Sequence, residues 1–323
     1  MRVVRIVLLA LGIALLVWLT ARLGVHQIVA MLMALRWAAV PVVLIFSAHQ
    51  FVRAVVLTLC VCGPERLSIV DAVRVRIAGE AVDFLSFSGP LAAEPAKAWL
   101  LHKRGFDVSV GLAATLAEYL TSSFVAAALV LAGVVYVLTM LHPSGPIRAA
   151  AAIVVLVMSS FLVLFVVGIG LRIHIIGAVV RGVLRLWPRG DSVSAHLPAL
   201  DRAEDLLIGT LRDAPRRLVA IVSLEALAQA FLVVELWWLL STLRMPAGIG
   251  QAALIEGTIK CMNEAFVPGQ VGIAEGAYAV VFSVFGLLPA AGLTISLARR
   301  IRNALTAAVG LVALFVFAPP PAN

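Results

Sequence analysis

The sequence predicts an all-α multi-pass membrane protein that forms a single integral membrane domain over residues 1–323. Hydrophobic residues make up 63% of the chain and charged residues only 13%, and the mean hydropathy is +1.09. Soluble domains carry about 25% charged residues, so this chain lacks the polar surface that water would require. Its apolar runs are also long enough to cross a hydrocarbon layer about 30 Å thick.

Six apolar runs are predicted to span the membrane, at 3–23, 37–61, 110–140, 148–171, 217–243 and 289–317. The first run follows Arg2 and Arg5 and is not followed by a small-residue cleavage site, so we expect a retained helix rather than a removed signal peptide. The one sizeable polar stretch, 172–216, is expected to be a partly helical cytoplasmic loop.

Two further segments, 68–104 and 250–288, are moderately apolar, interrupted by Gly and Pro, and carry carboxylates. The arms of the first segment, 71–87 and 92–103, are about 26 and 18 Å long as helices. Because the second arm is too short to cross the bilayer, we expect each segment to be a re-entrant helical hairpin. Two short full spans remain the alternative.

Basic residues orient the chain. If 68–104 and 250–288 each enter and leave the membrane by one face, the basic residues gather on one side, which is therefore cytoplasmic. They are Arg2, Arg5, Arg66, Arg74, Arg76, His102, Lys103, Arg104 and those of the 172–216 loop. Both termini are expected in the cytoplasm and the protein in the plasma (inner) membrane. The net charge of +8 then reflects contact with anionic lipid headgroups rather than with nucleic acid. The pattern does not predict an oligomeric state.

An internal repeat is the most informative pattern. A shift of 181 residues places 71–118 on 252–299 without a gap, and ten of the 48 positions are then identical. Four identities fall where AEPAKA (93–98) meets AEGAYA (274–279). Repeat 1 covers about 37–140 and repeat 2 about 217–317. Because the orientation places the two hairpins on opposite faces, the repeats are predicted to be inverted, as in transporters with a substrate site near the midplane.

The hairpin tips hold the first candidate site residues. Glu94 and Lys97 follow the turn Ser88-Gly89-Pro90, and Glu275 follows the turn 268–272, each carboxylate in the expected first turn of a helix. A helix that begins inside the membrane presents unpaired N–H groups that suit a phosphate or carboxylate. The alternative is that each glutamate caps its own helix.

Arginines within the apolar runs are the second group of candidates. Arg299 and Arg302 share a helix face in the last span, with Arg300 between them, and two guanidiniums there are able to hold a lipid phosphate. Alternatively they pair with buried acids such as Glu264 or Glu118. Arg53 lies well inside the second span and must face the protein interior, a cavity or the headgroups. Glu225 and Glu235 are weaker candidates.

Several enzyme signatures are missing from the sequence. It contains no Walker A loop, His/Cys metal cluster, G-x-S-x-G elbow or aspartate cluster for a Mg²⁺–diphosphate site. We therefore expect no cofactor and no metal, and a protein that is not an enzyme. An enzyme acting on a lipid-linked substrate remains the alternative, with its base among Glu94, Asp83 and Glu275.

At these residues the chain resembles the flippase-like family that includes the transmembrane region of lysylphosphatidylglycerol synthases. The family's Pro-Gly-rich turn followed by Gly-x-x-Glu-Gly stands here as VPGQVGIAEG (267–276), and its downstream arginine matches Arg299 or Arg300. The family's first motif appears as SGPLAAEPAK (88–97), with Ala-Glu in place of Gly-Glu and Lys97 in place of arginine. The chain is similar to stand-alone members, including hopanoid-associated ones, so we do not expect the lysine-transferring activity of the synthases.

Together the residues and the resemblance lead us to expect a flippase that moves an anionic or lipid-linked amphiphile between leaflets. Glu94 and Glu275 would shape and protonate a midplane site, while Lys97, Arg299, Arg302 and Arg53 bind the anionic group. The alternatives are an enzyme acting on a polyprenyl-phosphate or lipid-linked substrate and a non-catalytic scaffold of a lipid-synthesis complex.

Overall fold

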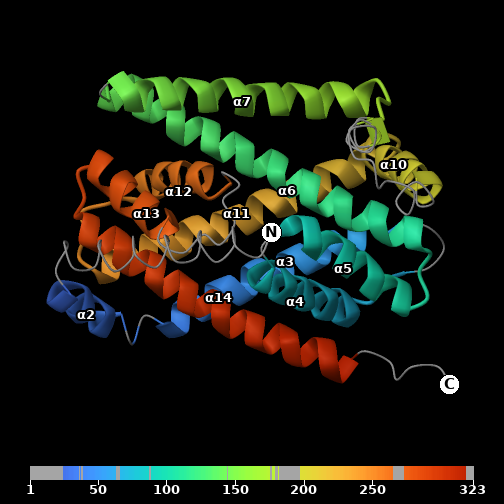
Figure 1. The fold of residues 1–323 in the computed structure, drawn as a ribbon, viewed down its shortest axis with the longest axis horizontal. Coiled ribbons are helices and arrows are strands. Elements are labelled where there is room, and N and C mark those ends of the chain that lie inside the picture. Colours follow the sequence, from blue (N-terminus) through green and yellow to red (C-terminus); the bar gives the residue numbers. More distant parts are fainter. Residues whose placement is uncertain are drawn as a thin grey trace, which may run out of the picture. The chain divides into compact units, whose positions relative to one another are not determined.

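The computed structural model describes residues 25–317 except 36, 38, 63–65, 87–88, 144, 175–176, 179–180, 182–196 and 265–272. Every regular element among these residues is helical (Figure 1). The elements are α2 (Val25–Ala34), α3 (Ala39–Cys60), α4 (Ile69–Leu85), α5 (Pro90–Lys103), α6 (Val108–Tyr136), the π-helical turn η1 (Val137–Leu141), α7 (Gly145–Gly170), α10 (Leu197–Arg212), α11 (Pro215–Thr242), α12 (Ile249–Glu264), α13 (Ile273–Val284) and α14 (Pro289–Phe317).

Four of the predicted spans are confirmed as helices that are long and apolar enough to cross a membrane. They are Ala39–Cys60, Val108–Leu141, Gly145–Gly170 and Pro215–Thr242. The predicted span at 3–23 lies outside the described residues. The predicted span at 289–317 forms the 29-residue helix α14, but three arginines interrupt its apolar sequence, and its crossing stays a prediction.

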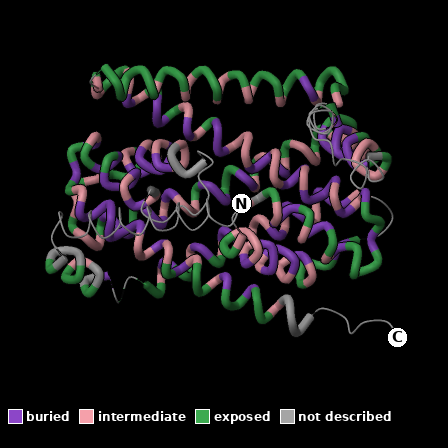
Figure 2. Tube along the Cα trace, in the orientation of Figure 1, coloured by how far each residue is buried: buried purple, intermediate pink, exposed green. Residues whose placement is uncertain are grey.

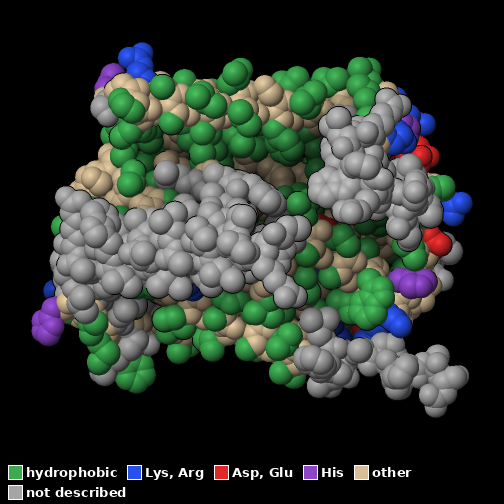
Figure 3. Space-filling view, viewed as in Figure 1, with side chains coloured by type: hydrophobic (Ala, Val, Ile, Leu, Met, Phe, Trp, Pro, Cys, Tyr) green, Lys and Arg blue, Asp and Glu red, His purple; other side chains and the backbone are tan. Residues whose placement is uncertain are grey.

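Helix α7 shows what surrounds the protein. Most of its residues are exposed (Figure 2), and the exposed side chains are largely apolar, among them Ile153, Leu156, Val163 and Val166. Figure 3 shows hydrophobic side chains along this helix. Such a surface is stable against lipid tails and not against water, because monomeric soluble proteins rarely expose apolar patches of this extent. The structure therefore agrees with a membrane-embedded protein.

The chain divides into two compact units, which we describe separately. Unit 1 comprises 1–49, 126–161 and 229–305, and unit 2 comprises 50–125, 162–228 and 306–323. Unit 2 contains the helix pair α4 and α5, and unit 1 contains the pair α12 and α13, each pair lying side by side (Figure 1). One core cluster fills each unit, around Leu57, Ala114 and Ile221 in unit 2 and around Leu236, Ile255 and Phe282 in unit 1.

The helix bounds agree with the 181-residue shift found in the sequence. It carries Val108 and Tyr136, the ends of α6, onto Pro289 and Phe317, the ends of α14. Gly105 and Gly286, which precede these helices and differ by the same shift, have φ angles of 100° and 71°. Glycine adopts positive φ without the steric strain that a side chain would add, so both turns have a glycine with positive φ at the same repeat position.

Close helix contacts also follow the shift, with the repeats exchanging partners. In unit 1, Gly257 of α12 packs against the carbonyl oxygen of Leu129 in α6; in unit 2, Gly310 of α14 packs against the carbonyl oxygen of Ile77 in α4. The first hairpin helix of each repeat thus packs against the long helix of the other repeat. Small residues allow such close approach of helices in membranes. That the hairpins are re-entrant and the repeats inverted stays a prediction.

This packing predicts a stability difference between two glycines of α12. Gly257→Ala places a methyl group against the backbone of Leu129, so we expect a loss of about 1–3 kcal/mol in unfolding free energy. Gly250→Ala is the matched control, because nothing lies within 4 Å of a Cβ at Gly250. Thermal unfolding of both variants in detergent measures the difference, and equal midpoints would contradict the close contact.

Candidate functional site

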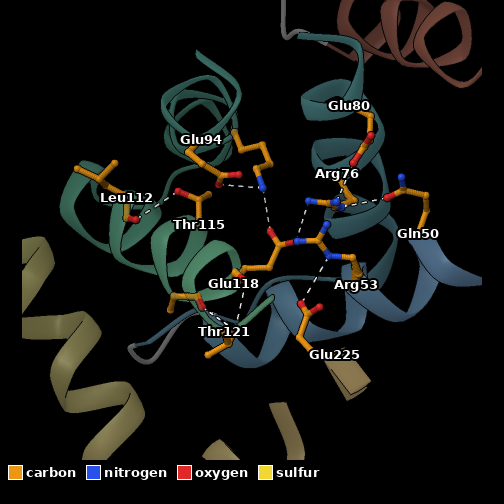
Figure 4. Close-up of polar contacts among 12 residues, drawn as sticks. Gln50, Arg53, Arg76, Glu80, Glu94, Leu112, Thr115, Glu118, Thr121 and Glu225 are labelled. Carbon is orange, nitrogen blue, oxygen red and sulfur yellow. Dashed lines mark hydrogen bonds and ion pairs between the residues drawn. The ribbon is translucent and has the colours of Figure 1, made fainter. Parts of the chain in front are cut away.

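A fully buried carboxylate, Glu118 of α6, is the hub of a charge cluster in unit 2. Its Oε1 lies 3.0 Å from Arg53 Nη2 and 2.8 Å from Arg76 Nη1, and its Oε2 lies 2.9 Å from Lys97 Nζ. The three cations come from α3, α4 and α5, so four helices converge on one side chain (Figure 4). One carboxylate therefore lies within ion-pair distance of three cations.

Each of the three cations also pairs with a second carboxylate. Glu80 pairs with Arg76 at 2.7 Å, Glu94 pairs with Lys97 at 2.9 Å, and Glu225 lies 3.5 Å from Arg53. Gln50 also accepts a hydrogen bond from Arg76 Nε at 3.0 Å. With four acids and three bases, the cluster carries a formal charge of −1. Pairing of this kind is what makes buried charges tolerable in apolar surroundings.

The α4–α5 packing holds Lys97 in place. Its side chain is 1% exposed, and a Cβ built on Gly79 of α4 would lie 2.6 Å from Lys97 Cγ. Gly79 therefore leaves the room that the aliphatic stem of Lys97 occupies. This packing places the ammonium group beside Glu94 and Glu118 and away from the protein surface.

Arg299 of α14 is the hub of a corresponding cluster in unit 1. Its Nη1 donates to Glu256 Oε2 at 2.8 Å and to the Tyr278 hydroxyl at 3.0 Å. Its Nη2 donates to the carbonyl oxygen of Leu232 at 3.1 Å and lies 3.5 Å from Glu235. These partners come from α11, α12 and α13, so this hub also joins four helices.

The neighbouring arginines of α14 extend this cluster. Arg302 pairs with Glu235, and its guanidinium carbon lies 3.7 Å from the ring centroid of Phe46. Arg300 lies 2.7 Å from Glu275 and is the most accessible of the three, with 30% of its side chain exposed. Three bases and three acids make the formal charge of this cluster zero.

The 181-residue shift relates the two hubs with inverted charge. It carries Glu118 onto Arg299, Lys97 onto Tyr278 and Glu94 onto Glu275. The contact between Lys97 and Glu118 in unit 2 thus corresponds to the contact between Tyr278 and Arg299 in unit 1. Position and pairing are kept, whereas the sign of the central charge is reversed.

Each sequence-predicted site residue lies in one of these clusters. The structure places Arg53, Glu94 and Lys97 together in unit 2, and Glu275, Arg299 and Arg302 together in unit 1. Residues Ser88 and 268–272 of the predicted tips lie outside the described residues.

Three details of the sequence interpretation are wrong. Glu94 is the fifth residue of α5, beyond its first turn, and it bonds Lys97; the N-cap Gly89 has no side-chain capping bond. Arg76, counted as an interfacial residue for orientation, is buried because Glu118 and Glu80 neutralise it. The alternative that Arg299 and Arg302 pair with buried acids agrees with the structure, but the partners it shows are Glu256 and Glu235 and not the suggested Glu118; the side chain of Glu264 is not described.

Sequence reasoning missed Arg76, Glu256 and Tyr278 as members of the clusters. Arg76 could have been found from helical spacing, because Arg76 and Glu80 are four residues apart and form an ion pair on one helix face. Tyr278 was visible only as the repeat partner of Lys97. Among the residues that the structure describes, no group of three or more His, Cys, Asp or Glu side chains is arranged to hold a metal ion.

Apolar helices of membrane-crossing length around buried ionised side chains define a polytopic membrane protein with a polar interior. The chain belongs to the family of the lysylphosphatidylglycerol synthase TM region, whose family model matches residues 3–310. The matched range includes both clusters and both helix pairs. No curated protein and no solved structure matches the chain.

The Glu118 hub predicts a large difference between two isosteric substitutions. Glu118→Gln removes the one carboxylate that contacts all three buried cations, and removal of one partner of a buried ion pair costs about 3–5 kcal/mol. Asp213→Asn is the control, because Asp213 and Arg172 form a pair that is more than half exposed, where pairs contribute about 0–1 kcal/mol. The unfolding free energy of both variants is measured in detergent. An equal decrease in the two variants would contradict the role of the hub.

Proposed function

We propose that the chain moves an anionic lipid headgroup between bilayer leaflets, without changing the lipid covalently. The observation that carries this proposal is the set of three cations around Glu118. Membership of a family of lipid-related membrane proteins supports it. The proposed partners are membrane lipids, and the proposed location is the plasma (inner) membrane.

The chemistry of the hub suits a phosphate. The guanidiniums of Arg53 and Arg76 match phosphate oxygens bidentately, and the ammonium of Lys97 adds a further donor. In this proposal Glu118 occupies the anion site when no lipid is bound. Because the cluster already carries a charge of −1, an entering phosphate is favourable only if Glu118 swings away or a carboxylate takes up a proton. Glu94, which shares Lys97 with Glu118, is the proposed proton acceptor.

The Arg299 cluster is the proposed second contact for the headgroup. Arg300, Arg299 and Arg302 offer three guanidiniums, each already held by a carboxylate. Here, as at Glu118, a phosphate would take the place of a carboxylate beside the cations. Glu275, fully buried and paired with the most accessible arginine, is the carboxylate whose release we expect first.

Headgroup accessibility in proteoliposomes tests the proposal. Labelled phosphatidylglycerol should move between leaflets faster with the protein than without it. Arg53→Gln, Lys97→Gln, Glu275→Gln and Arg299→Ala should each slow this movement by about 10–100-fold, since hydrogen bonds to charged groups contribute about 1.5–3 kcal/mol. Arg148→Gln, at the exposed start of α7, is the matched control and should not change the rate.

Three results would contradict this proposal. No acceleration with any of several anionic lipids, from protein with a normal unfolding midpoint, would contradict translocation. Mass spectrometry that finds a chemically altered lipid after incubation would instead favour the enzyme acting on a lipid-linked substrate. Equal acceleration of labelled phosphatidylcholine would contradict the role of the three cations.

A further inference from the structure

A surface groove in unit 2 is separate from the two charge clusters. It has a volume of about 410 Å³ and lies between α3, α4 and the end of α14, within the range of about 300–1,000 Å³ typical of small-ligand sites. Phe51, Val70 and Val73 line it together with Val309 and Val312, and Arg74 is its charged lining residue.

The groove is closed on its inner side by helix packing. Ile77, which also lines it, belongs to the stretch of α4 whose backbone meets Gly310 of α14. Because glycine lets these two helices touch, the larger side chains on either side form walls and leave the groove between them. Phe51, Val70 and Val312 are each more than half exposed, so the groove is open at the surface of the molecule.

Charged side chains lie at one end of the groove. Asp71 Oδ1 lies 3.3 Å from Arg74 Nη1 and 3.2 Å from Arg104 Nη1, so two guanidiniums share one carboxylate. These three residues have a summed charge of +1. Both arginine side chains are about one third exposed, and Arg74 extends its aliphatic stem along the groove while its guanidinium turns back toward the start of α4.

A neighbouring aromatic residue marks this end as a membrane interface. Trp99 of α5 is half exposed, and Lys103 Nζ lies 5.3 Å from the centroid of its ring. Tryptophan with adjacent basic residues is enriched at the level of lipid headgroups. His102 and Lys103 are exposed beside Arg104, which adds to the positive potential.

We propose that this groove binds one acyl chain of an anionic glycerophospholipid, with its phosphate on Arg74 and Arg104. The apolar walls match the chain, and the surplus positive charge at the interfacial end matches the phosphate. A free phosphate would leave the apolar walls unused, and a neutral lipid would leave the guanidiniums without a new anion. This binding site is independent of the proposed translocation.

The experiment measures lipid retention by the purified full chain in native mass spectrometry, with phosphatidylglycerol and phosphatidylcholine of identical acyl chains. We expect preferential retention of phosphatidylglycerol. The double variant R74A/R104A should lose it by about 10–100-fold, as expected for charge-assisted hydrogen bonds. Val312→Trp, which fills the groove, should weaken retention of both lipids.

Matched controls lie on α7. Arg148→Ala removes an exposed arginine, and Leu164→Trp enlarges an exposed apolar side chain, and neither should alter retention. Phosphatidylglycerol with a photoactivatable acyl chain should label peptides containing 69–77 and 309–313. Equal retention of the two lipids, equal losses in the control variants, or labelling spread along α7 would each overturn the proposal.

The same preparations separate this inference from translocation. Arg53→Gln should slow headgroup movement by about 10–100-fold while leaving phosphatidylglycerol retention in the groove unchanged. If R74A/R104A loses phosphatidylglycerol retention but still moves the headgroup between leaflets, the groove is a binding site outside the transport path. Movement without any phosphatidylglycerol preference in retention would overturn the groove proposal alone.

Discussion

The cost of holding an ionised group away from water is the constraint on which the rest of this structure depends. Glu118 and Arg299 are both buried, and each is paired with groups from three other helices. Apolar packing alone does not dictate which helix meets which in lipid, because the tails are as apolar as the side chains. The directional contacts of the two hubs supply that information, and the same groups are the ones available to an anionic ligand.

The two hubs solve one packing problem with opposite charges. A carboxylate at position 118 requires cations on the adjoining helices, and a guanidinium at position 299 requires acids there. At the one partner position that the shift preserves, the cationic Lys97 is replaced by the neutral hydroxyl of Tyr278, which accepts a hydrogen bond from Arg299. A duplicated chain with identical hubs would carry two copies of one site, whereas this chain presents an anion-centred and a cation-centred site from the same scaffold.

Much of the fold could be predicted from the sequence, because apolar runs and the 181-residue shift depend only on local composition. The ends of α6 and α14 follow that shift, and all six predicted site residues fall in the clusters. The pairing within the clusters could not be predicted. Arg76 lies two residues from Arg74, yet one is buried and the other lines a groove, and only the position of Glu118 on another helix decides between them. Arg299 likewise finds Glu256 through α12–α14 packing, a contact that residue spacing does not encode.

The exchange of partners between repeats has a consequence for biosynthesis. Unit 2 draws on residues 50–125 but also on 306–323, where Gly310 packs against Ile77. When the ribosome has made the first repeat, the α4 surface that will meet α14 has no partner, and it acquires one only after α14 has been made. The packing of the first repeat is therefore completed only by a helix of the second repeat. A lipid chain lying along α4 would cover that surface until α14 packs against it.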